Sequence, residues 1–438
     1  MKRLFGTDGI RGIVNDELTV ELAMKLGNSI SKLYNGKYDT LLIAMDTRNS
    51  GDMFSYALTT GAISSGMNVE ICGVIPTPAL AFLTKVKKTV GIVISASHNP
   101  SAYNGLKVLC EGYKIPDEDE IELEKMILES KLEYSPYGEI GKVKRNGIKS
   151  KYIEYVSEFY KGMKSEKRIA IDVGNGAAGN VVNEIFEKVG INADIYYNNP
   201  DGFNINEKCG STSPEKLSEI VQKNGYDLGI LYDGDADRCL FIDRNGNLID
   251  GDKLMAVNAF KMKEKGRLSN SSVVATVMSN LGFEEYLKLH GIKLLRTQVG
   301  DKYVLEKMID SKINIGGEQS GHIIFFDRAT TGDGIITSLE TIDTMNYFGK
   351  NIDELVKEIP EYPQVLKNVS VGDKKKIMTD ERIENIISRY SQNDDYRLLV
   401  RPSGTEHKIR VMAEGKDRNL VEKSVDEIYA LIEIIDKE

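Results

Sequence analysis

One pattern constrains the fold more than any other: short apolar segments that run into polar, glycine-bearing loops recur along the whole chain. A first set, each followed by a helix-like stretch, comprises "TLLIAMDTRNS" (40–50), "KRIAIDVGNGAAG" (167–179) and "SVVATVMSNLG" (272–282). Apolar strands that alternate with amphipathic helices are typical of α/β domains. The pattern therefore predicts an α/β protein.

A second set of strand-to-loop junctions follows the first at a distance of a few tens of residues. It comprises "VGIVISASHNP" (90–100), "DLGILYDGDADR" (227–238) and "KINIGGEQSGH" (312–322). The same order occurs three times, which predicts three related mixed α/β domains. Each would present a polar loop at the carboxyl end of a strand, where open α/β sheets gather their ligands.

The chain is too long for one hydrophobic core, because its 438 residues exceed the ~250–300 at which single cores stop growing. Polar or proline-bearing segments at 133–150, 243–252 and 358–368 suggest junctions, and the second of them, "DRNGNLIDGD", is typical of a hairpin turn. The last part mixes helix-like "TDERIENIISRY" with strand-like "YRLLV" and "HKIRVMAE". We expect α/β domains at residues 1–150, 151–254 and 255–365, and a smaller α+β domain at 366–438.

Charge and composition restrict the class of partner. The formal charge of −9 argues against nucleic acid and against an anionic membrane, both of which require a basic face. An anionic substrate would therefore need local positive charge. The N-terminus lacks the apolar core of a signal peptide, no run approaches ~20 apolar residues, and the cysteines (Cys72, Cys110, Cys209, Cys239) are widely spaced. We expect a cytoplasmic protein with reduced thiols.

The pair Ser97–His98 suggests serine-hydrolase chemistry, but its surroundings argue against it. A nucleophile elbow needs glycines on both sides of the serine, and Ser95 and Asn99 stand there instead. Side chains of adjacent residues also tend to diverge, so we expect His98 to be poorly placed to take a proton from Ser97. Taken alone, the stretch also fits a turn held by local hydrogen bonds.

The stretch "DGDADR" (233–238) places carboxylates at every second residue, Asp233, Asp235 and Asp237. In a loop these point to one side and can enclose a hard divalent cation. A calcium EF-hand is the rival, but its sixth position is Arg238 rather than glycine and its twelfth is Arg244 rather than glutamate. Magnesium, which keeps positions open for phosphate oxygens, fits better than calcium or a solvated acidic turn.

Two further loops carry groups suited to an anion and to a sugar. "RPSGTEHK" (401–408) combines a guanidinium, two hydroxyls and a glycine, the parts of a phosphate or carboxylate cradle. "GGEQSGH" (316–322) offers Glu318 and Ser320 to sugar hydroxyls, next to His322. Each could also be a plain turn or glycine loop.

Near the N-terminus, "FGTDGIRG" (5–12) places Arg11 between glycines, which suggests close approach of the backbone to a ligand. "YNGLKV" (103–108) contains Lys107, a candidate base if burial or the neighbouring Arg11 lowers its pKa. A lysine in such a place is otherwise a solvated charge.

The four motifs "SASHNP", "DGDADR", "GEQSGH" and "RPSGTE", in this order, resemble those of the α-D-phosphohexomutase superfamily. "FGTDGIRG", "PDGFNINEKCGSTSPEKL", "DGDKLM", "TVMSNLGFEEYL", "RTQVGDKYV" and "ATTGDGI" extend the similarity over nearly the whole chain, and Gln319 favours the glucosamine branch. His407 departs from the proline expected after "RPSGTE". The resemblance implies three α/β domains and a smaller fourth one around a central active-site cleft.

The resemblance also implies the roles of individual residues. Ser97 would be a phosphoserine, Lys107 the general base, Arg11 the group that positions the phosphoryl group, and His322 a second acid–base candidate. The metal would be one Mg²⁺, held by Asp233, Asp235, Asp237 and a phosphoserine oxygen. The substrate would be bound by Glu318, Ser320, Arg238, Arg401, Ser403, Gly404 and Thr405.

The implied reaction converts glucosamine 6-phosphate to glucosamine 1-phosphate through a hexose 1,6-bisphosphate, in support of UDP-N-acetylglucosamine and peptidoglycan biosynthesis. A homodimer is also implied. Two alternatives remain open at this point. One is a phosphomannomutase or phosphoglucomutase of the same superfamily, and the other is a catalytically silent protein that binds sugar phosphates.

Overall fold

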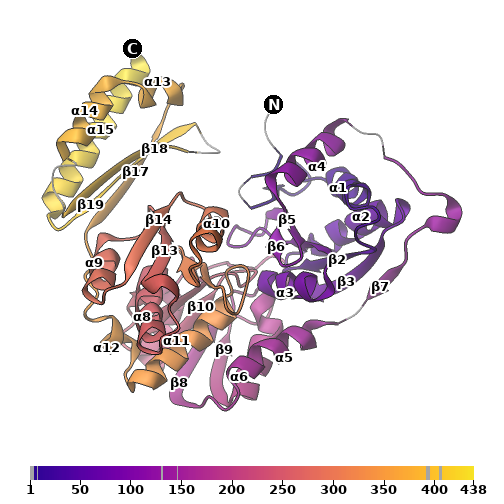
Figure 1. The fold of residues 1–438 in the computed structure, drawn as a ribbon, viewed down its shortest axis with the longest axis horizontal. Coiled ribbons are helices and arrows are strands. Elements are labelled where there is room, and N and C mark those ends of the chain that lie inside the picture. Colours follow the sequence, from indigo (N-terminus) through magenta and orange to yellow (C-terminus); the bar gives the residue numbers. More distant parts are fainter. Residues whose placement is uncertain (1–3, 7, 130–131, 146, 391–394, 404–406) are drawn as a thin grey trace. The chain divides into compact units, whose positions relative to one another are not determined.

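The computed structural model describes residues 4–6, 8–129, 132–145, 147–390, 395–403 and 407–438, and it confirms the expected mixed α/β architecture (Figure 1). The chain divides into two compact units. The larger comprises Met1–Met278 and Leu294–Val356, and the smaller comprises Ser279–Lys293 and Lys357–Glu438. The boundaries of the four predicted domains stay predictions.

The first sheet of the larger unit has the strand order β1-β5-β4-β2-β3-β7, with β6 beside β5. Its strands β2, β3, β4 and β7 are parallel where they pair, whereas β5 runs antiparallel to both β4 and β1. The strands are β1 (Ile10–Ile13), β2 (Thr40–Met45), β3 (Asn68–Val74), β4 (Val90–Ile94), β5 (Tyr103–Cys110), β6 (Tyr113–Lys114) and β7 (Val143–Arg145). The segment expected to be a junction, 133–150, therefore contributes an edge strand to this sheet.

Helices cover both faces of the first sheet (Figure 1). Leu41 and Ile43 of β2 belong to the core shared with α1 (Val20–Leu33) and α2 (Gly51–Ser64), and α4 (Asp117–Glu129) also packs there. The opposite face meets α3 (Thr77–Lys87), because a side chain on Gly91 of β4 would collide with Thr84 of that helix. Helices α1 and α2 cross closely: a Cβ on Gly61 would lie 2.0 Å from the backbone oxygen of Met24.

The second sheet of the larger unit has the order β12-β11-β10-β8-β9. Strands β8, β9 and β10 are parallel, and β11 returns antiparallel to β10. The expected hairpin at 243–252 is present as the turn between β11 and β12. The elements are β8 (Ser165–Asp172), β9 (Ile191–Tyr196), β10 (Leu228–Tyr232), β11 (Cys239–Asp243), β12 (Leu248–Ile249), α5 (Lys149–Phe159), α6 (Val182–Val189) and α7 (Glu215–Asn224).

The third sheet has the order β14-β13-β15-β16, with β13 and β15 parallel and β16 antiparallel to β15. Its elements are β13 (Ser272–Thr276), β14 (Lys293–Thr297), β15 (Ile315–Gly317), β16 (Ile323–Phe325), α8 (Gly251–Glu264), α10 (Asp301–Ser311), α11 (Gly334–Phe348) and α12 (Ile352–Val356). Single 3₁₀ turns occur at Tyr137–Glu139, Ala177–Asn180 and Ser269–Ser271.

The three sheets share one local design. In each, a strand that belongs to the parallel part is followed by an antiparallel neighbour: β4–β5, β10–β11 and β15–β16. The connecting loops contain "SASHNP", "DGDADR" and "EQSGH". The threefold repeat inferred from sequence order is therefore present in the topology, and it places each polar motif in the same position of its own sheet.

The smaller unit contains a sheet of order β17-β19-β18, antiparallel throughout. Its apolar face packs on the long C-terminal helix through residues such as Val425 and Ile432. The elements are α9 (Leu281–Leu289), β17 (Gln364–Ser370), α13 (Lys374–Met378), α14 (Glu381–Tyr390), β18 (Tyr396–Pro402), β19 (Lys408–Gly415) and α15 (Arg418–Lys437). The helix and the two strands expected in this region are all present.

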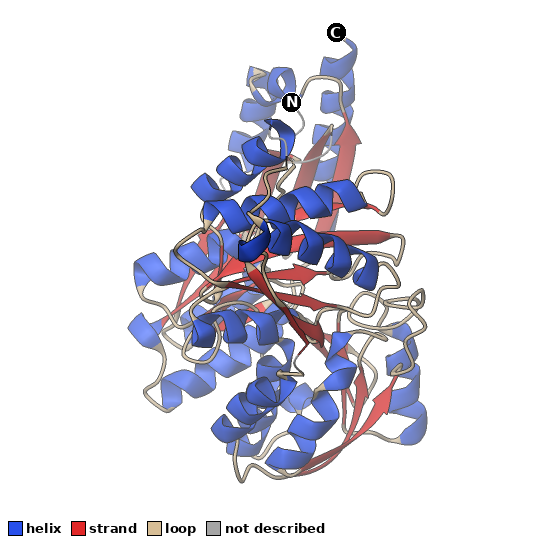
Figure 2. Cartoon of the chain, turned by 90° about the vertical axis from the view of Figure 1, so that its right-hand side faces the viewer, coloured by secondary structure: helices blue, strands red, loops and turns tan. Residues whose placement is uncertain are grey.

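Figure 2 shows strands flanked by helices, as an α/β protein requires. Within the described residues, every helix is too short or too polar to cross a lipid bilayer. The four cysteines are free thiols, as expected from their spacing.

Candidate active site

Ser97 lies in the loop between β4 and β5, and its side chain faces the second sheet's polar loop. Its hydroxyl donates to Asp233 Oδ2 at 2.6 Å, and the residue is only 1% exposed. Its backbone is left-handed, with φ of 52°. The Nδ1 atom of His98 lies 3.3 Å from the Ser97 hydroxyl oxygen, closer than we expected, because the left-handed turn prevents the two adjacent side chains from diverging.

Burial governs the proton state of His98. Together with the nearby charges of Arg238 and Arg11, it lowers the pKa of His98 to about 4. His98 is therefore a neutral neighbour of the serine. No carboxylate contact orients it as a catalytic triad would require, within the described residues.

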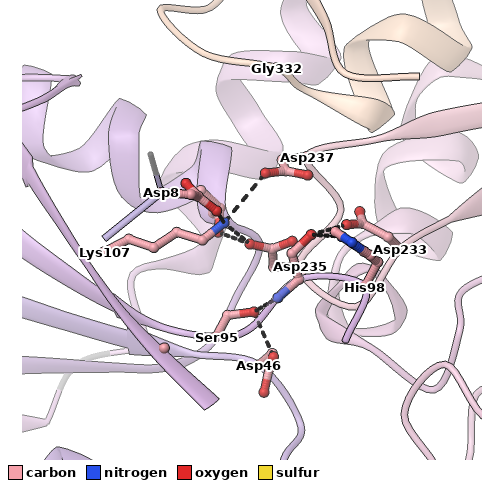
Figure 3. Close-up of polar contacts among 12 residues, drawn as sticks. Asp8, Asp46, Ser95, His98, Lys107, Asp233, Asp235, Asp237 and Gly332 are labelled. Carbon is pink, nitrogen blue, oxygen red and sulfur yellow. Dashed lines mark hydrogen bonds and ion pairs between the residues drawn. The ribbon is translucent and has the colours of Figure 1, made fainter. Parts of the chain in front are cut away.

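Asp233, Asp235 and Asp237 follow β10 and converge on one point. They are 0%, 0% and 6% exposed, and one oxygen from each lies within 4.8 Å of the others. Ala236 adopts a left-handed conformation, with φ of 57°, which curves the loop around that point. Figure 3 shows the three carboxylates beside Lys107, Asp8 and His98.

These carboxylates have the donor set of a metal site. Oδ1 of Asp235 and Oδ1 of Asp237 are buried and have no hydrogen-bond partner among the described residues. Burial, followed by the charges of Asp237 and Asp235, raises the pKa of Asp233 well above its ordinary value. An all-oxygen cluster with unsatisfied buried acceptors fits a hard divalent cation, which would remove this cost.

The ammonium of Lys107, on β5, is the main positive charge that meets this cluster. It lies 2.8 Å from Asp235 Oδ2, 3.5 Å from Asp237 Oδ2 and 2.9 Å from Asp8 Oδ2. Burial alone would lower the pKa of Lys107, but these three carboxylates raise it well above the usual lysine value. The lowered pKa on which we based its role as a base is therefore absent from this arrangement, in which Lys107 is a cation.

Asp8 joins Lys107 to the other cations of the first domain. It contacts Arg11, and Lys114 Nζ lies 2.8 Å from its Oδ1. Burial opposes ionisation of Asp8, but Lys107, Lys114 and Arg11 together hold its pKa well below the usual range. Lys114 continues to Asp301 at the start of α10, at 2.7 Å.

Arg238 closes the second sheet's loop on the cluster. Its backbone N–H donates to Asp233 Oδ1 at 3.2 Å, and its Nε lies 3.9 Å from Asp237 Oδ1. Although burial works against the charge, Asp237 and Asp233 raise the pKa of Arg238 further. The structure thus places Arg238 against two carboxylates of the cluster, Asp233 and Asp237.

His322, at the end of the third sheet's loop, reaches the same cluster. Nδ1 lies 3.6 Å from Asp237 Oδ2, and the N–H of Gly332 donates to Nε2 at 3.0 Å. Burial would lower the pKa of His322, but Asp237 and then Asp301 raise it to about 9. Gly332 can donate to Nε2 only while that atom is unprotonated, so this hydrogen bond favours the neutral ring with its proton on Nδ1 and opposes the protonation that Asp237 and Asp301 favour.

Glu318 and Ser320 lie in the same loop, at its outer side. Ser320 Oγ donates to Glu318 Oε2 at 3.4 Å, and the N–H of Gly300 donates to Glu318 Oε1 at 3.1 Å. Both side chains are half-buried. They are therefore accessible to a ligand, as a role in binding sugar hydroxyls requires.

A cavity of about 410 Å³ opens beside this site. Lys114, Asp301 and His322 form part of its wall, and the rest includes Leu109, Tyr113, Ile115, Leu305, Ile309 and Ile324. The wall formed by Lys114, Asp301 and His322 adjoins the charged cluster.

The candidate phosphate loop belongs to the smaller unit. Gly404 and Thr405 lie outside the described residues, whereas Arg401 and Ser403 are described. Arg401 pairs across the sheet with Arg410, and Lys374 Nζ donates to the Ser403 carbonyl at 2.8 Å. Burial and then the charge of Arg410 lower the pKa of Arg401. This concentration of cations suits an anion.

Our reading of the sequence missed several residues of the site. Asp8 stands in the same short motif as Arg11, but we predicted a role only for Arg11. Thr77, which donates to Asp235 Oδ2 at 2.6 Å, begins α3 and lies far from Asp235 in the sequence. Lys114 and Asp301 are also far apart in the sequence, and the fold brings them into contact. Proximity of this kind leaves no local signal.

Family models match nearly the whole chain. They describe phosphoglucomutase/phosphomannomutase alpha/beta/alpha domain I at residues 2–133, domain II at 150–246 and domain III at 250–362, and the C-terminal domain at 366–431.

Curated relatives are similar over their full length. A phosphoglucosamine mutase of Thermosipho africanus is 47% identical over 436 residues, which cover 99% of each chain. A phosphoglucosamine mutase of Carboxydothermus hydrogenoformans is 48% identical over 443 residues, which cover 99% of this chain and 100% of the relative.

Solved structures share the fold at lower sequence identity. A phosphoglucomutase/phosphomannomutase family protein from Burkholderia thailandensis aligns with a TM-score of 0.85 and 21% identity, over 99% of this chain and 98% of that one. The N-acetylphosphoglucosamine mutase of Aspergillus fumigatus, in complex with GlcNAc-6P and magnesium, aligns with a TM-score of 0.70 and 17% identity, over 100% of this chain and 96% of that one.

Proposed function

The chain belongs to the phosphoglucomutase/phosphomannomutase family, and from that premise we propose that it is a phosphoglucosamine mutase. It would interconvert glucosamine 6-phosphate and glucosamine 1-phosphate. One observation carries the proposal: the Ser97 hydroxyl lies 2.6 Å from a buried three-carboxylate cluster in the next domain's loop. The relatives that cover the whole chain support the choice of substrate.

Phosphorylated Ser97 is the donor in this reaction. The sugar 1-hydroxyl of glucosamine 6-phosphate attacks the phosphorus, the bond from phosphorus to Ser97 Oγ breaks, and the hydroxyl proton passes to a base. The product of this step is the 1,6-bisphosphate. After the bisphosphate has reoriented in the site, Ser97 Oγ loses its proton and attacks the phosphorus of the 6-phosphoryl group, the bond from that phosphorus to the sugar O6 breaks, O6 takes up a proton, and glucosamine 1-phosphate leaves. No water is consumed, because the serine is rephosphorylated in each cycle.

Asp233, Asp235 and Asp237 would hold one Mg²⁺, with an oxygen of the phosphoserine as a further ligand. Bound there, the ion would supply Lewis-acid polarisation of the phosphoryl group and neutralise charge that develops during transfer. Oδ1 of Asp235 and Oδ1 of Asp237, which have no hydrogen-bond partner among the described residues, support this assignment.

Lys107 would be the base that receives the hydroxyl proton. The charges of Asp235 and Asp237 stabilise its ammonium, so Lys107 would lose this stabilisation if those charges were neutralised. Arg11, held by Asp8, would orient the phosphoryl oxygens. Bidentate guanidinium donors suit that task.

The remaining residues would bind and orient the substrate. Glu318 and Ser320 would bind ring hydroxyls in either orientation of the sugar, and His322 would act as a second acid–base group with its proton on Nδ1. Arg238 would balance the charge of the cluster. The phosphate-binding role of Arg401, Ser403, Gly404 and Thr405 stays a prediction, as do the homodimer, the cytoplasmic location and the supply of amino sugars for cell-wall synthesis.

A coupled assay for glucosamine 1-phosphate with Mg²⁺ tests the proposal. We expect the wild type to be active, Ser97→Ala to be inactive, and Ser101→Ala, a control in the same loop, to keep full activity. Activity in Ser97→Ala would refute the phosphoserine route.

Two alternatives have their own outcomes. Equal or better turnover of mannose or glucose phosphates would reassign the chain to another member of the family. A protein that gains no phosphoryl group from a hexose 1,6-bisphosphate, measured by intact-protein mass spectrometry, would be a silent sugar-phosphate-binding protein.

A further inference from the structure

A fully buried guanidinium lies beneath the Ser97 loop. Arg48 follows β2, and its side chain is 0% exposed. It makes five hydrogen bonds: Nε to Asp46 Oδ2 (2.9 Å), Nη1 to the carbonyls of Pro100 (2.6 Å) and Tyr103 (3.0 Å), and Nη2 to the carbonyls of Ser97 (3.0 Å) and Asn99 (2.7 Å). A guanidinium has five N–H groups, so each of them is matched by an acceptor.

A second set of bonds joins the same arginine to the N–H of Ser97. Asp46 Oδ2 accepts from Ser95 Oγ at 2.6 Å, and Ser95 Oγ accepts from the Ser97 N–H at 2.9 Å. The result is a closed ring, which we call the Arg48 clamp: Ser97 N–H, Ser95 hydroxyl, Asp46 carboxylate, Arg48 guanidinium, Ser97 carbonyl. Figure 3 shows Ser95 and Asp46 below the carboxylate cluster.

The second domain adds one bond to this ring. Asn206 Nδ2 donates to the Ser97 carbonyl at 2.9 Å, so that carbonyl has two donors from two different domains. Both peptide groups that flank the Ser97 α-carbon are therefore fixed. The hydroxyl can reach Asp233 only if those peptides hold their orientation.

The backbone of Ser97 needs such support. With φ of 52°, it occupies the left-handed region, which is unfavourable for a residue that carries a Cβ and which persists only where the surroundings impose it. The clamp supplies that constraint without touching the hydroxyl. The hydroxyl thus stays available for chemistry, while hydrogen bonds to the Ser97 N–H and carbonyl fix its position.

We propose that Arg48 is a positioning residue for phosphoryl transfer: its clamp holds Ser97 in the strained backbone conformation that aims the hydroxyl at the Asp233 cluster. The proposal rests on the proposed function, because it assigns the clamp a task in that reaction. A lysine could keep the charge of Arg48, but its single ammonium has three donors and no planar fork, so it cannot bond four carbonyls and a carboxylate together.

The test compares Arg48→Lys with Arg168→Lys. Arg168 is a matched control because its guanidinium also binds backbone carbonyls, those of Asn224 and Gly225, on the exterior of the second sheet. Three quantities are measured in each variant: the melting temperature, kcat and KM for glucosamine 6-phosphate, and deuterium uptake of the peptide that spans residues 95–104.

For Arg48→Lys we expect kcat to fall by about 10²-fold, the cost typical of a misplacement of about 1 Å, with KM changed less than about threefold. Deuterium uptake should rise in residues 95–104 and remain at the wild-type level in the peptides of the third sheet. Arg168→Lys should leave kcat, KM and uptake in residues 95–104 unchanged. An unchanged kcat in folded Arg48→Lys, or a loss of activity that only tracks the folded fraction, would overturn the proposal.

Ser95→Ala supports the test if Arg48→Lys does not fold. It removes only the link between Asp46 and the Ser97 N–H. We therefore expect kcat to fall with little change in KM, and deuterium uptake to rise in residues 95–104, both by less than in Arg48→Lys. Wild-type levels of both would overturn the proposal. The deuterium comparison needs no activity: if the wild type is inactive, the proposed function fails, while local loosening of residues 95–104 still reports on the clamp.

Discussion

The replacement Lys107→Met tests the electrostatics of the site directly. Lys107 is 2% exposed and has carboxylates at 2.8, 2.9 and 3.5 Å. Methionine has a similar length and keeps the apolar packing but removes the charge. The buried carboxylates of Asp235 and Asp237 would then lose their shared cation, whereas Asp8 would keep its contacts with Arg11 and Lys114.

Breaking a buried ion pair by the loss of one partner typically costs about 3–5 kcal/mol. At about 2–4 °C per kcal/mol, the melting temperature in EDTA should fall by roughly 6–20 °C relative to the wild type. Added Mg²⁺ should then stabilise Lys107→Met more than the wild type, because the ion no longer competes with the ammonium for Asp235 and Asp237. The assay is differential scanning fluorimetry across a Mg²⁺ titration.

Lys261→Met is the matched control. Lys261 is likewise fully buried and contacts Glu340 at 3.2 Å, together with Asp343, but it lies outside the three-carboxylate cluster. We expect a comparable loss of stability without extra rescue by Mg²⁺. Equal Mg²⁺ gains in the wild type and both variants would refute the assignment of the cluster as the metal site.

Two further predictions concern stability away from the chemistry. Burial raises the pKa of Asp172 to about 7, although hydrogen bonds from backbone N–H groups lower it. Because the folded state then binds the proton more tightly than the unfolded state, Asp172 should add to the free energy of unfolding as the pH falls from about 7 towards 4. Urea denaturation should show that this contribution is lost in Asp172→Asn, and the same pH slope in the variant and the wild type would contradict the reasoning. Gly61→Ala places a Cβ 2.0 Å from the Met24 oxygen and should cost about 1–3 kcal/mol or more by overpacking α1 against α2, whereas Gly138→Ala, where no heavy atom lies within 4 Å, should be nearly neutral in the same denaturation assay.

Much of the architecture could be predicted because the same local sequence pattern recurs along the chain. Apolar strands that end in polar loops predicted the three α/β sheets, and the order of the second set predicted that each motif would follow a strand. The segment 143–145 was missed as an edge strand. It is short, polar and exposed, so it carries none of the burial pattern by which strands are identified.

In the candidate site, too, some features could be predicted from local sequence signals and others could not. The spacing of Asp233, Asp235 and Asp237 is a local signal, and the structure brings them together. The contact of the cluster with Ser97 followed from the family resemblance rather than from spacing. The charge state of Lys107 could not be predicted, because Asp8 and Asp235 come from distant parts of the chain, and their combined field outweighs burial.

The Arg48 clamp shows a further limit of sequence reasoning. Its parts lie in the motifs "MDTRNS" and "SASHNP", both of which were noticed as strand-to-loop junctions. Nothing in either motif shows that one guanidinium bonds three carbonyls of the other motif and, beyond it, the carbonyl of Tyr103. Such a network depends on the pairing of β2 with β4, which is a property of the fold.

Anomalous scattering from crystals of the Mn²⁺-loaded protein tests the central claim most directly, since it locates the ion without reference to activity. The account predicts one strong peak among the carboxylates of Asp233, Asp235 and Asp237, at roughly 2.0–2.2 Å from their oxygens and next to Ser97 Oγ. A peak elsewhere on the surface, with Asp233 still bonded to Ser97 and with Asp235 and Asp237 still paired with Lys107, would contradict it.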